Sequence, residues 1–280
     1  MDKAGKAIIR IQYAYEIALN AGNDLICAYS GGKDSDVLLD LCKKAGVPFR
    51  AEHNHTTADA PETVYHIHEV FSGNVDAKIN YPEMTMWELI PTFNTPPLAL
   101  ASYCCSVLKE RRFNNQHLLM GVRWCESNTR KANRGLHEKL GSKRKAKHIY
   151  LDENDDKRKL LEICQTKNRV ATNPIVDWTV REIWEYVHKE KIKMNPLYSY
   201  GFDRVGCVGC PKSGKKGMNK TLARYPKIKA AYVRAFDKML IERAKREKPT
   251  EWKTGLDVYK WWTIVGFNPS QLTLEDVGYD

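Results

Sequence analysis

The hexapeptide Ser30-Gly31-Gly32-Lys33-Asp34-Ser35 constrains the fold of this chain more than any other stretch. The apolar run Leu25 to Tyr29 precedes it and is short enough to be a buried strand, and apolar residues at helical spacing follow it as far as Gly46. A strand that enters a helix through two glycines leaves backbone N–H groups unpaired at the helix start, where the helix dipole also favours an anion. The loop therefore predicts phosphate binding, with the lysine adding charge and the serines adding hydroxyl donors. A plain tight turn is the alternative.

The segments around this loop alternate between expected strands and helices. An amphipathic helix is expected over residues 4–19, a second strand over 47–53, a helix from Pro61 and a third strand over 76–80. This alternation predicts an α/β fold with a doubly wound, Rossmann-like parallel sheet, whose ligands bind at the carboxyl ends of the strands. The hexapeptide lies at such an end.

A second polar segment follows the strand expected over residues 117–122. It starts at Gly121 and contains Arg123, Glu126, Ser127 and Arg130. Two arginines at a strand end can each hold a phosphate or sulfate group through two hydrogen bonds, and the small residues permit a close approach. A solvated loop is the alternative.

Composition narrows the class of protein. The chain has 280 residues, a formal net charge of +11 and a hydrophobic content of 42%. The basic excess indicates an anionic partner, which can be a nucleotide or a nucleic acid, or else a solvated basic surface. No apolar run approaches the roughly 20 residues of a membrane span, and the N-terminus lacks the pattern of a signal peptide, so we expect a cytoplasmic protein without a membrane partner.

Four of the eight cysteines form two pairs that are far apart in the sequence. In a cytoplasmic protein, cysteines indicate metal or redox chemistry more than disulfides. Cys104 and Cys105 are adjacent and cannot form a disulfide with each other without strain. Cys207 and Cys210 form a Cys-x-x-Cys sequence beside glycines, which is typical of a metal or cluster knuckle.

Two further segments define the expected domain organisation. Residues 131–159 crowd lysines and arginines before several acidic residues, with little apolar periodicity, so we expect a mobile basic insertion that acts as a lid, a nucleic-acid contact or an ordinary charged loop. A basic amphipathic helix is expected over 227–248. We therefore expect a domain over residues 1–215 and a C-terminal helical extension over 216–280 that packs on it.

Taken together, these motifs resemble the phosphoadenosine phosphosulfate (PAPS) reductase family of the adenine-nucleotide α-hydrolase superfamily. In that superfamily the sequence Ser-Gly-Gly-x-Asp-Ser forms the pyrophosphate loop, or PP-loop. The resemblance keeps the family's order and covers about two-thirds of the chain. Besides the PP-loop it includes Pro61-Glu62-Thr63, Cys104-Cys105 with Lys109, Gly121-Val122-Arg123 with Glu126, Ser127 and Arg130, Asn173-Pro174 with Asp177-Trp178, and Gly206-Cys207 to Cys210-Pro211.

The resemblance implies a site for an adenine nucleotide, either ATP or a sulfonucleotide such as PAPS or adenylyl sulfate. Lys33 and Arg123 are then the expected catalytic residues, with Mg²⁺ assisting at the phosphates. The nucleotide-binding residues implied are Ser30, Gly31, Gly32, Lys33, Asp34, Ser35, Gly121, Arg123, Glu126, Ser127 and Arg130. By the same resemblance, Cys104, Cys105, Cys207 and Cys210 hold a [4Fe–4S] cluster beside the nucleotide site, with zinc as the alternative.

Two departures from the sulfonucleotide reductases shape the functional hypothesis. Those enzymes use a cysteine in a Glu-Cys-Gly-Leu-His tail, whereas this sequence has no cysteine after Cys210. They also tend to have a degraded loop, whereas the loop here is intact, as in relatives that split ATP. We therefore expect an ATP pyrophosphatase that activates a substrate for iron–sulfur-assisted sulfur transfer, as in DNA or RNA thiolation.

Two alternatives stay open. One is a sulfonucleotide reductase that releases sulfite, and the other is a non-catalytic nucleotide- or nucleic-acid-binding module of a larger assembly. A nucleic-acid substrate, a sulfur-donor protein and a homo-oligomer are all compatible with the sequence, which identifies none of them.

Overall fold

The computed structural model describes residues 2–73, 76–110, 116–139, 170–248 and 250–264. The chain divides into two compact units. The first, which we call the sheet unit, comprises Met1–His53, Glu62–Asn80 and Arg112–Val205. The second, the helical unit, comprises Asn54–Pro61, Tyr81–Arg111 and Gly206–Asp280.

The described residues of the sheet unit form a six-stranded sheet in the order β3-β2-β1-β4-β6-β5. β1 pairs in parallel with β2 on one side and with β4 on the other, β4 pairs in parallel with β6, and β5 is antiparallel to β6. Because the order runs outward in both directions from β1, the sheet has the doubly wound arrangement that the sequence predicts. The strands are β1 (Asp24–Ala28), β2 (Arg50–Asn54), β3 (Ala77–Asn80), β4 (Gln116–Leu119), β5 (His137–Lys139) and β6 (Val170–Thr172).

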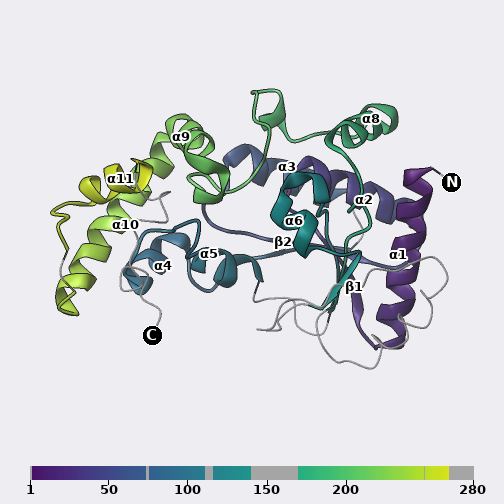
Figure 1. The fold of residues 1–280 in the computed structure, drawn as a ribbon, viewed down its shortest axis with the longest axis horizontal. Coiled ribbons are helices and arrows are strands. Elements are labelled where there is room, and N and C mark those ends of the chain that lie inside the picture. Colours follow the sequence, from purple (N-terminus) through teal and green to yellow (C-terminus); the bar gives the residue numbers. More distant parts are fainter. Residues whose placement is uncertain (1, 74–75, 111–115, 140–169, 249, 265–280) are drawn as a thin grey trace. The chain divides into compact units, whose positions relative to one another are not determined.

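Local sequence signals set the bounds of the helices that cover this sheet. Helix α1 (Lys3–Asn20) begins where the Asp2 carboxylate accepts a hydrogen bond from the Gly5 N–H at 2.7 Å. Helix α2 (Lys33–Ala45) starts inside the hexapeptide and ends at Gly46. Figure 1 shows α1 and α2 beside β1, where the apolar faces of both helices meet side chains of the strand.

Three further helices belong to this part of the chain: α3 (Pro61–Ser72), α6 (Asn128–Asn133) and α8 (Val180–Glu190). Thr179 caps α8, because its hydroxyl accepts the Glu182 N–H at 3.2 Å. Just before this helix, Asp177 forms an ion pair with Arg10 at 2.7 Å.

The core of the sheet unit follows the alternation of the strands. Leu25, Cys27 and Tyr29 point to the side that α1, α2, α3 and α8 cover, and they share one apolar cluster with Leu38 and Ile183. The opposite side carries a smaller cluster around Ile26, Leu118 and Ala171.

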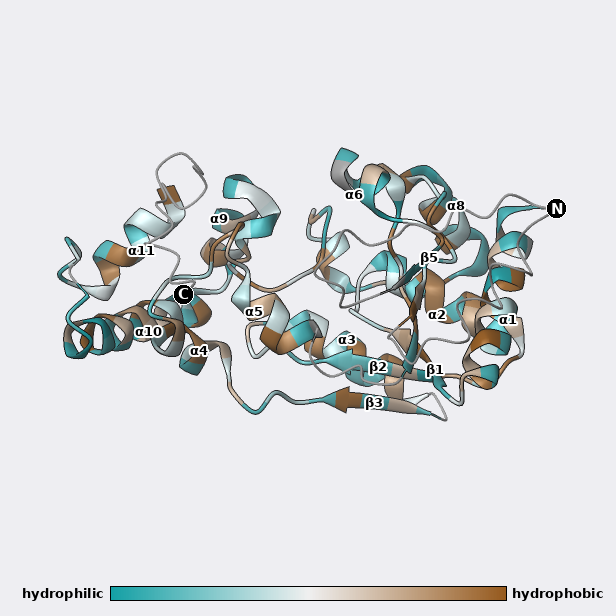
Figure 2. Ribbon diagram, turned by 60° about the horizontal axis from the view of Figure 1, so that its bottom comes forward, coloured by the Kyte–Doolittle hydropathy of each residue, from teal (hydrophilic) through white to brown (hydrophobic). Residues whose placement is uncertain are grey.

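The helical unit contains α4 (Met86–Phe93), α5 (Tyr103–Cys105), which continues into a π-helical turn (Ser106–Glu110), α9 (Gly214–Arg224), α10 (Pro226–Lys245) and α11 (Gly255–Ile264). Aromatic rings fill its centre: the Tyr232 ring lies 5.0 Å from Trp87 and 4.8 Å from Trp262. The Trp262 indole donates a hydrogen bond to the Pro97 carbonyl at 2.6 Å. Figure 2 shows hydrophilic and hydrophobic residues alternating along α10, as expected of an amphipathic helix.

Some expected features fall partly outside the described residues. Of the expected insertion at 131–159, residues 131–139 end α6 and form β5, and the rest lies outside the described ranges. No described helix is both long enough and apolar enough to cross a membrane.

Candidate functional site

The hexapeptide forms a tight loop between β1 and α2. Gly31 has a φ of +71°, and a Cβ placed on it would lie 3.0 Å from the Ile67 side chain and 3.1 Å from Thr63. The Gly31 carbonyl accepts a hydrogen bond from the Asn195 amide at 2.9 Å. A side chain at this position would be strained both by the positive φ and by its neighbours, so the loop requires glycine here.

The two serines of the loop bind each other and the backbone. The Ser35 hydroxyl accepts the Gly32 N–H at 3.1 Å and donates to the Gly32 carbonyl at 2.8 Å. The Ser30 hydroxyl lies 3.2 Å from the Ser35 hydroxyl. These bonds hold the loop in shape without a ligand, so binding an anion would require little ordering of its backbone.

The first N–H group of α2 faces Tyr198 from a distant segment, the 3-10 turn Pro196–Tyr198. The Lys33 N–H donates to the Tyr198 hydroxyl at 2.8 Å, and the Lys33 ammonium lies 5.8 Å from the Tyr198 ring centre. Burial raises the pKa of Tyr198 well above its usual value, so this hydroxyl stays protonated. Tyr198 therefore occupies a donor that a phosphate oxygen would use.

Asp34 joins the loop to Arg123, which follows β4. The Arg123 guanidinium, in a residue only 2% exposed, lies 2.7 Å from one Asp34 carboxylate oxygen, and the Lys33 ammonium lies 3.2 Å from the other. A Cβ at Gly121 would lie 3.1 Å from the Asp34 backbone. The structure thus brings together Lys33, Asp34, Gly121 and Arg123, because β1 and β4 are neighbours in the sheet and end at the same edge.

The other polar residues after β4 bind one another. Arg130 and Glu126 form an ion pair, and the Ser127 hydroxyl accepts the Arg130 N–H at 3.1 Å at the start of α6. The Arg123 N–H donates to Glu126 at 3.1 Å, which connects this group to the buried arginine through its backbone. Within the described residues, no hydrogen bond or ion pair joins Ser127 or Arg130 to the hexapeptide.

A thiol also lies beside this arginine. The Cys125 sulfur is 2.8 Å from a guanidinium nitrogen of Arg123 and 3.3 Å from the Trp178 carbonyl oxygen, and the residue is exposed. Cys125 therefore lies within hydrogen-bond distance of the arginine that pairs with Asp34 of the loop.

Beneath the loop lies a buried polar group that the sequence did not point to. The Tyr29 hydroxyl donates to the Asp36 carboxylate at 2.5 Å, and His66 Nε2 lies 3.0 Å from the same oxygen. Burial and the neighbouring carboxylate raise the pKa of Tyr29 far above its usual value. Tyr29 and Asp36 flank the hexapeptide on both sides, so this bond fixes the strand end to the first turn of α2.

In the helical unit, the four cysteines of the two pairs line one small cavity of about 30 Å³. Cys104 and Cys105 reach it from α5, and Cys207 and Cys210 reach it from the loop before α9. All four are free thiols. The structure therefore brings together the two pairs that are about 100 residues apart in the sequence.

Glycine shapes the second cysteine pair. Gly209 has a φ of +71°, and a Cβ there would lie 3.1 Å from each of Leu222, Tyr232 and Trp262. The Cys207 sulfur lies 3.3 Å from the Thr56 hydroxyl, and Cys207 forms an isolated β-bridge with Asp59. The segment from Cys207 to Cys210 is therefore held by Thr56 and Asp59 at Cys207 and by the side chains packed around Gly209.

The thiols raise one another's pKa. Burial raises the pKa of Cys207 to about 11, although the nearby Lys109 ammonium acts in the opposite direction. The pKa of Cys104 is raised much further, by its hydrogen bond with Cys105, by burial and by the thiols of Cys207 and Cys210. Crowded thiolates repel, and a bound cation would remove that repulsion as it displaced the protons.

The donor set fits an iron–sulfur cluster. Four cysteine sulfurs around one cavity are the ligands such a cluster needs. The same four thiolates are also the donor set of a tetrahedral zinc site.

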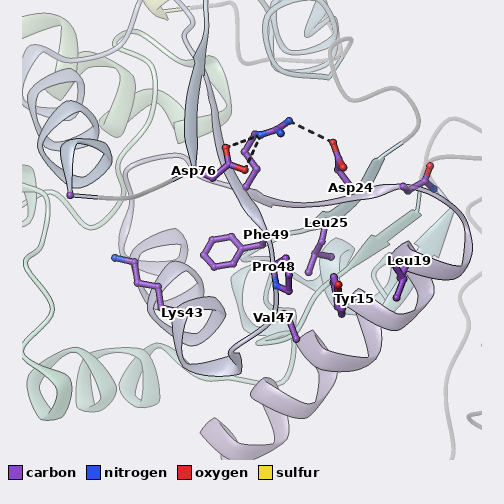
Figure 3. Close-up of a pocket in the computed structure, with 12 residues that line it drawn as sticks. Tyr15, Leu19, Asp24, Leu25, Lys43, Val47, Pro48, Phe49 and Asp76 are labelled. Atoms are coloured by element: carbon purple, nitrogen blue, oxygen red, sulfur yellow. Dashed lines mark hydrogen bonds and ion pairs between the residues drawn. The ribbon is translucent and has the colours of Figure 1, made fainter.

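A larger cavity lies elsewhere. Figure 3 shows this pocket of about 780 Å³, which is lined by Tyr15 and Leu19 of α1, Leu25 of β1 and Phe49 before β2. It opens at the amino ends of β1 and β2, away from the edge that carries the hexapeptide. No residue that the sequence analysis placed in a site lines it.

The chain is similar to known proteins over most of its length. The sequence model of the phosphoadenosine phosphosulfate reductase domain matches residues 24–213. An uncharacterized protein of Methanocaldococcus jannaschii is 26% identical over 73% of this chain and 39% of its own length. An adenosine 5'-phosphosulfate reductase of Lysinibacillus sphaericus is 24% identical over 68% of this chain and 75% of its own length. The chain spans half or less of the first two curated relatives that it matches.

Solved structures are similar at a lower level. The phosphoadenylyl-sulfate reductase of Candida auris in a phosphate complex gives a TM-score of 0.44 at 16% identity, covering 69% of this chain and 87% of the other. The U34-tRNA thiolase NcsA of Methanococcus maripaludis with its [4Fe-4S] cluster gives 0.40 at 14% identity, covering 97% of this chain and 88% of the other. Likenesses at this level carry no inference about chemistry.

Proposed function

Because the chain belongs to the phosphoadenosine phosphosulfate reductase family and to the adenine-nucleotide α-hydrolase superfamily, we propose that it is an ATP pyrophosphatase. In this proposal it binds ATP on the loop from Ser30 to Ser35 and splits it between the α- and β-phosphates to activate a substrate for sulfur transfer. The observation that carries the proposal is the complete loop, preformed at the start of α2 with Lys33 and Arg123 beside it.

The loop supplies the phosphate contacts. The N–H groups at the start of α2 and the two serine hydroxyls are donors for the β- and γ-phosphate oxygens, and the helix dipole adds to their effect. Lys33 supports this role because its residue is only 7% exposed, where a charge acts strongly on a bound phosphate. Mg²⁺ would bridge phosphate oxygens and reduce their repulsion.

Arg123 supports charge stabilisation at the same edge of the sheet. Its guanidinium is held by Asp34 and does not have to be ordered when a ligand arrives. Asp34 also pairs with Lys33, so it keeps both cations in place and balances their charge before binding. Charge that develops on the leaving pyrophosphate would draw both cations from Asp34 toward the phosphates.

The proposed reaction has two steps. An oxygen of the substrate attacks the α-phosphorus, the bond to the bridging oxygen breaks, and pyrophosphate leaves with that electron pair. A hydrosulfide ion then attacks the activated carbon or phosphorus of the substrate, the bond to the oxygen breaks, and AMP leaves with that oxygen. The net result is an oxygen replaced by sulfur, with one ATP converted to AMP and pyrophosphate.

The cysteine cavity supports a sulfur-handling role. Cys104, Cys105, Cys207 and Cys210 would hold a [4Fe–4S] cluster, which would supply electron-transfer chemistry at this cavity. Lys109 lies close to these thiols, and Cys207 raises the pKa of the Lys109 ammonium. Its positive charge would therefore offset part of the negative charge of the thiolate ligands.

ATP cleavage by the loop is tested with purified protein, ATP and Mg²⁺, with and without a panel of RNA and DNA. We expect AMP and pyrophosphate in equal amounts, and at least a hundredfold lower rate for Lys33→Ala. Lys43→Ala is the matched control, since Lys43 is an exposed lysine on the same helix. Equal rates in the native chain and in Lys33→Ala would reject the assignment of the loop.

The cysteine site is tested separately by metal analysis of anaerobically purified protein. We expect about four iron atoms and four sulfides per chain, and loss of both when Cys207 and Cys210 are replaced by serine. Cys125→Ser is the control and should retain the iron. One zinc ion per chain in the native protein would contradict the cluster.

One observation favours a second candidate function, a sulfonucleotide reductase. Cys125 is an exposed thiol in hydrogen-bond contact with Arg123, so it is accessible and lies beside a cation that could hold a sulfate group. In that reaction the thiolate attacks the sulfur of adenylyl sulfate, the S–O bond breaks and AMP leaves, and a second thiol then releases sulfite. Sulfite release that depends on Cys125 would support this candidate in place of ATP cleavage.

A further inference from the structure

The helical unit carries a run of positive charge that the proposed ATP chemistry does not use. Between Asp203 and Asp237 the sequence contains nine lysines and arginines and no acidic residue. Eight of the nine follow Cys210, in a stretch that contains α9 and the first half of α10. An excess of one sign over 33 residues, uninterrupted by any carboxylate, is the electrostatic pattern of a surface that binds a polyanion.

Most of these charges are exposed and regularly placed. Lys216, Lys220 and Arg224 are four residues apart on α9, so they lie on one side of the helix at a rise of about 6 Å per step. Lys212, Lys215 and Lys227 are exposed at either end of this line. We call these six residues the basic surface. Its even spacing suits a ligand whose charges are also repeated along a chain.

The surroundings of the basic surface argue against an acidic protein or a membrane as the partner. Protein interfaces have an apolar centre, and amphipathic helices bind membranes through exposed apolar side chains. None of the large hydrophobic side chains exposed in the described part of the chain falls within residues 212–229. Electrostatic attraction is therefore the main contribution this surface offers, which is the regime of nucleic-acid backbone binding.

Aromatic rings accompany the charges. The Arg224 guanidinium lies 5.7 Å from the Tyr225 ring centre, and the Lys229 ammonium lies 5.0 Å from that of Tyr259 on α11. Basic side chains next to tyrosine rings are typical of sites where phosphates bind the cations and unstacked bases lie on the rings. A duplex keeps its bases stacked inside and cannot use such rings.

We propose that the basic surface on α9 and the start of α10 binds single-stranded nucleic acid, through its phosphates and without strict sequence preference. This deepens the proposed function, on which its link to sulfur transfer rests. The surface begins two residues after Cys210, so a strand bound there passes next to the candidate cluster site of the same unit.

The test is fluorescence anisotropy of the full chain with a labelled single strand of about 20 nucleotides, as RNA and as DNA, and with the matched duplex. Binding is measured between about 50 and 200 mM salt. The variant K216A/K220A/R224A removes the central line of charge. The control K6A/K78A/K189A removes the same charge from exposed lysines of the sheet unit.

We expect the native chain to bind both single strands more tightly than the duplex. The basic-surface variant should bind at least about tenfold more weakly, with a salt slope smaller by about two, since each phosphate contact on a single strand contributes about 0.7. The control should bind within about twofold of the native chain. Circular dichroism and thermal unfolding establish that both variants keep the fold.

Three results would overturn the proposal: equal losses in the two variants, tighter binding of the duplex, or full competition by poly-glutamate at equal charge. The assay contains no ATP. A native chain that binds single strands but does not cleave ATP would refute only the ATP proposal. If the native chain cleaves ATP but K216A/K220A/R224A binds single strands as tightly as the native chain, only the present proposal is refuted.

Discussion

The Tyr198 hydroxyl accepts the first N–H of α2, that of Lys33, at 2.8 Å. This bond joins residues 165 positions apart and closes the anion-binding end of the helix when no ligand is present. A phosphate on the loop has to share this N–H or displace the phenol. Tyr198 is therefore placed to set the affinity of the loop for phosphates.

Replacing Tyr198 by phenylalanine tests this relationship. The variant keeps the ring but leaves the Lys33 N–H without its acceptor, so we expect the ligand-free protein to lose about 1 kcal/mol of unfolding free energy. Pyrophosphate should bind several-fold more tightly, because it no longer competes with the hydroxyl. Urea unfolding and calorimetric titration measure the two effects. Weaker pyrophosphate binding by the variant would mean that the hydroxyl is itself a ligand contact.

Asp34 holds a buried cation, so its charge should matter for stability. Asp34→Asn leaves the Arg123 guanidinium without a carboxylate, and we expect a loss of about 2–4 kcal/mol, reduced from the fully buried case because Asp34 is 21% exposed. Glu185→Gln is the control, since its partner Arg181 is largely exposed and the pair should contribute less than about 0.5 kcal/mol. Similar losses in both variants would contradict the special position of Asp34.

The histidines His117 and His137 should make the fold sensitive to acid. Both rings bind the Thr172 hydroxyl, at 2.7 and 2.8 Å, and burial lowers the pKa of His117 to about 3 and of His137 to about 4. Since an unfolded histidine titrates near 6.5, the unfolded state takes up protons that the folded state refuses as the pH falls below about 6.5. Stability should therefore be complete above that pH and decrease below it, by up to about 2.7 kcal/mol per pH unit while both rings contribute.

Urea unfolding from pH 7 to pH 4 measures this slope. Replacing both histidines by glutamine removes the titrating groups, so the variant should show a flatter profile over the same range even if its stability at pH 7 is lower. An unchanged slope in the variant would show that other groups cause the acid sensitivity.

Gly209 should not tolerate a side chain, whereas Gly206 in the same knuckle should. At Gly209, a positive φ and three side chains at 3.1 Å oppose a Cβ, and we expect Gly209→Ala to cost about 2–4 kcal/mol. At Gly206 no atom lies within 4 Å of an added Cβ, so Gly206→Ala should change stability by less than about 1 kcal/mol. Thermal unfolding of both variants checks this difference, and equal costs would contradict the packing around Gly209.

The sequence predicted the parts of this fold that depend on local signals. Helix α1, the loop at Ser30 and helix α2 carry their own caps, apolar periodicity and glycines, so their bounds are close to expectation. The closeness of Lys33 and Arg123 also followed from the sequence, because each lies at the carboxyl end of a strand.

Features that depend on distant segments were missed. Strands β5 and β6 have three residues each and lack a strand pattern, so they exist because they pair with each other and with β4. Helix α9 contains two glycines and few apolar residues, which hides its periodicity. Asn195 and Tyr198 belong to a short turn around Pro196, and nothing near them in the sequence indicates that both bind the loop at Ser30.

The most direct test of the central claim offers the native chain two substrates under identical anaerobic conditions. ATP with Mg²⁺ is supplied in one reaction and adenylyl sulfate with a dithiol reductant in the other, both with single-stranded RNA or DNA present. The account predicts AMP and pyrophosphate in a one-to-one ratio from ATP, lost in Lys33→Ala, and no sulfite from adenylyl sulfate. Sulfite release from adenylyl sulfate with ATP left intact would contradict it.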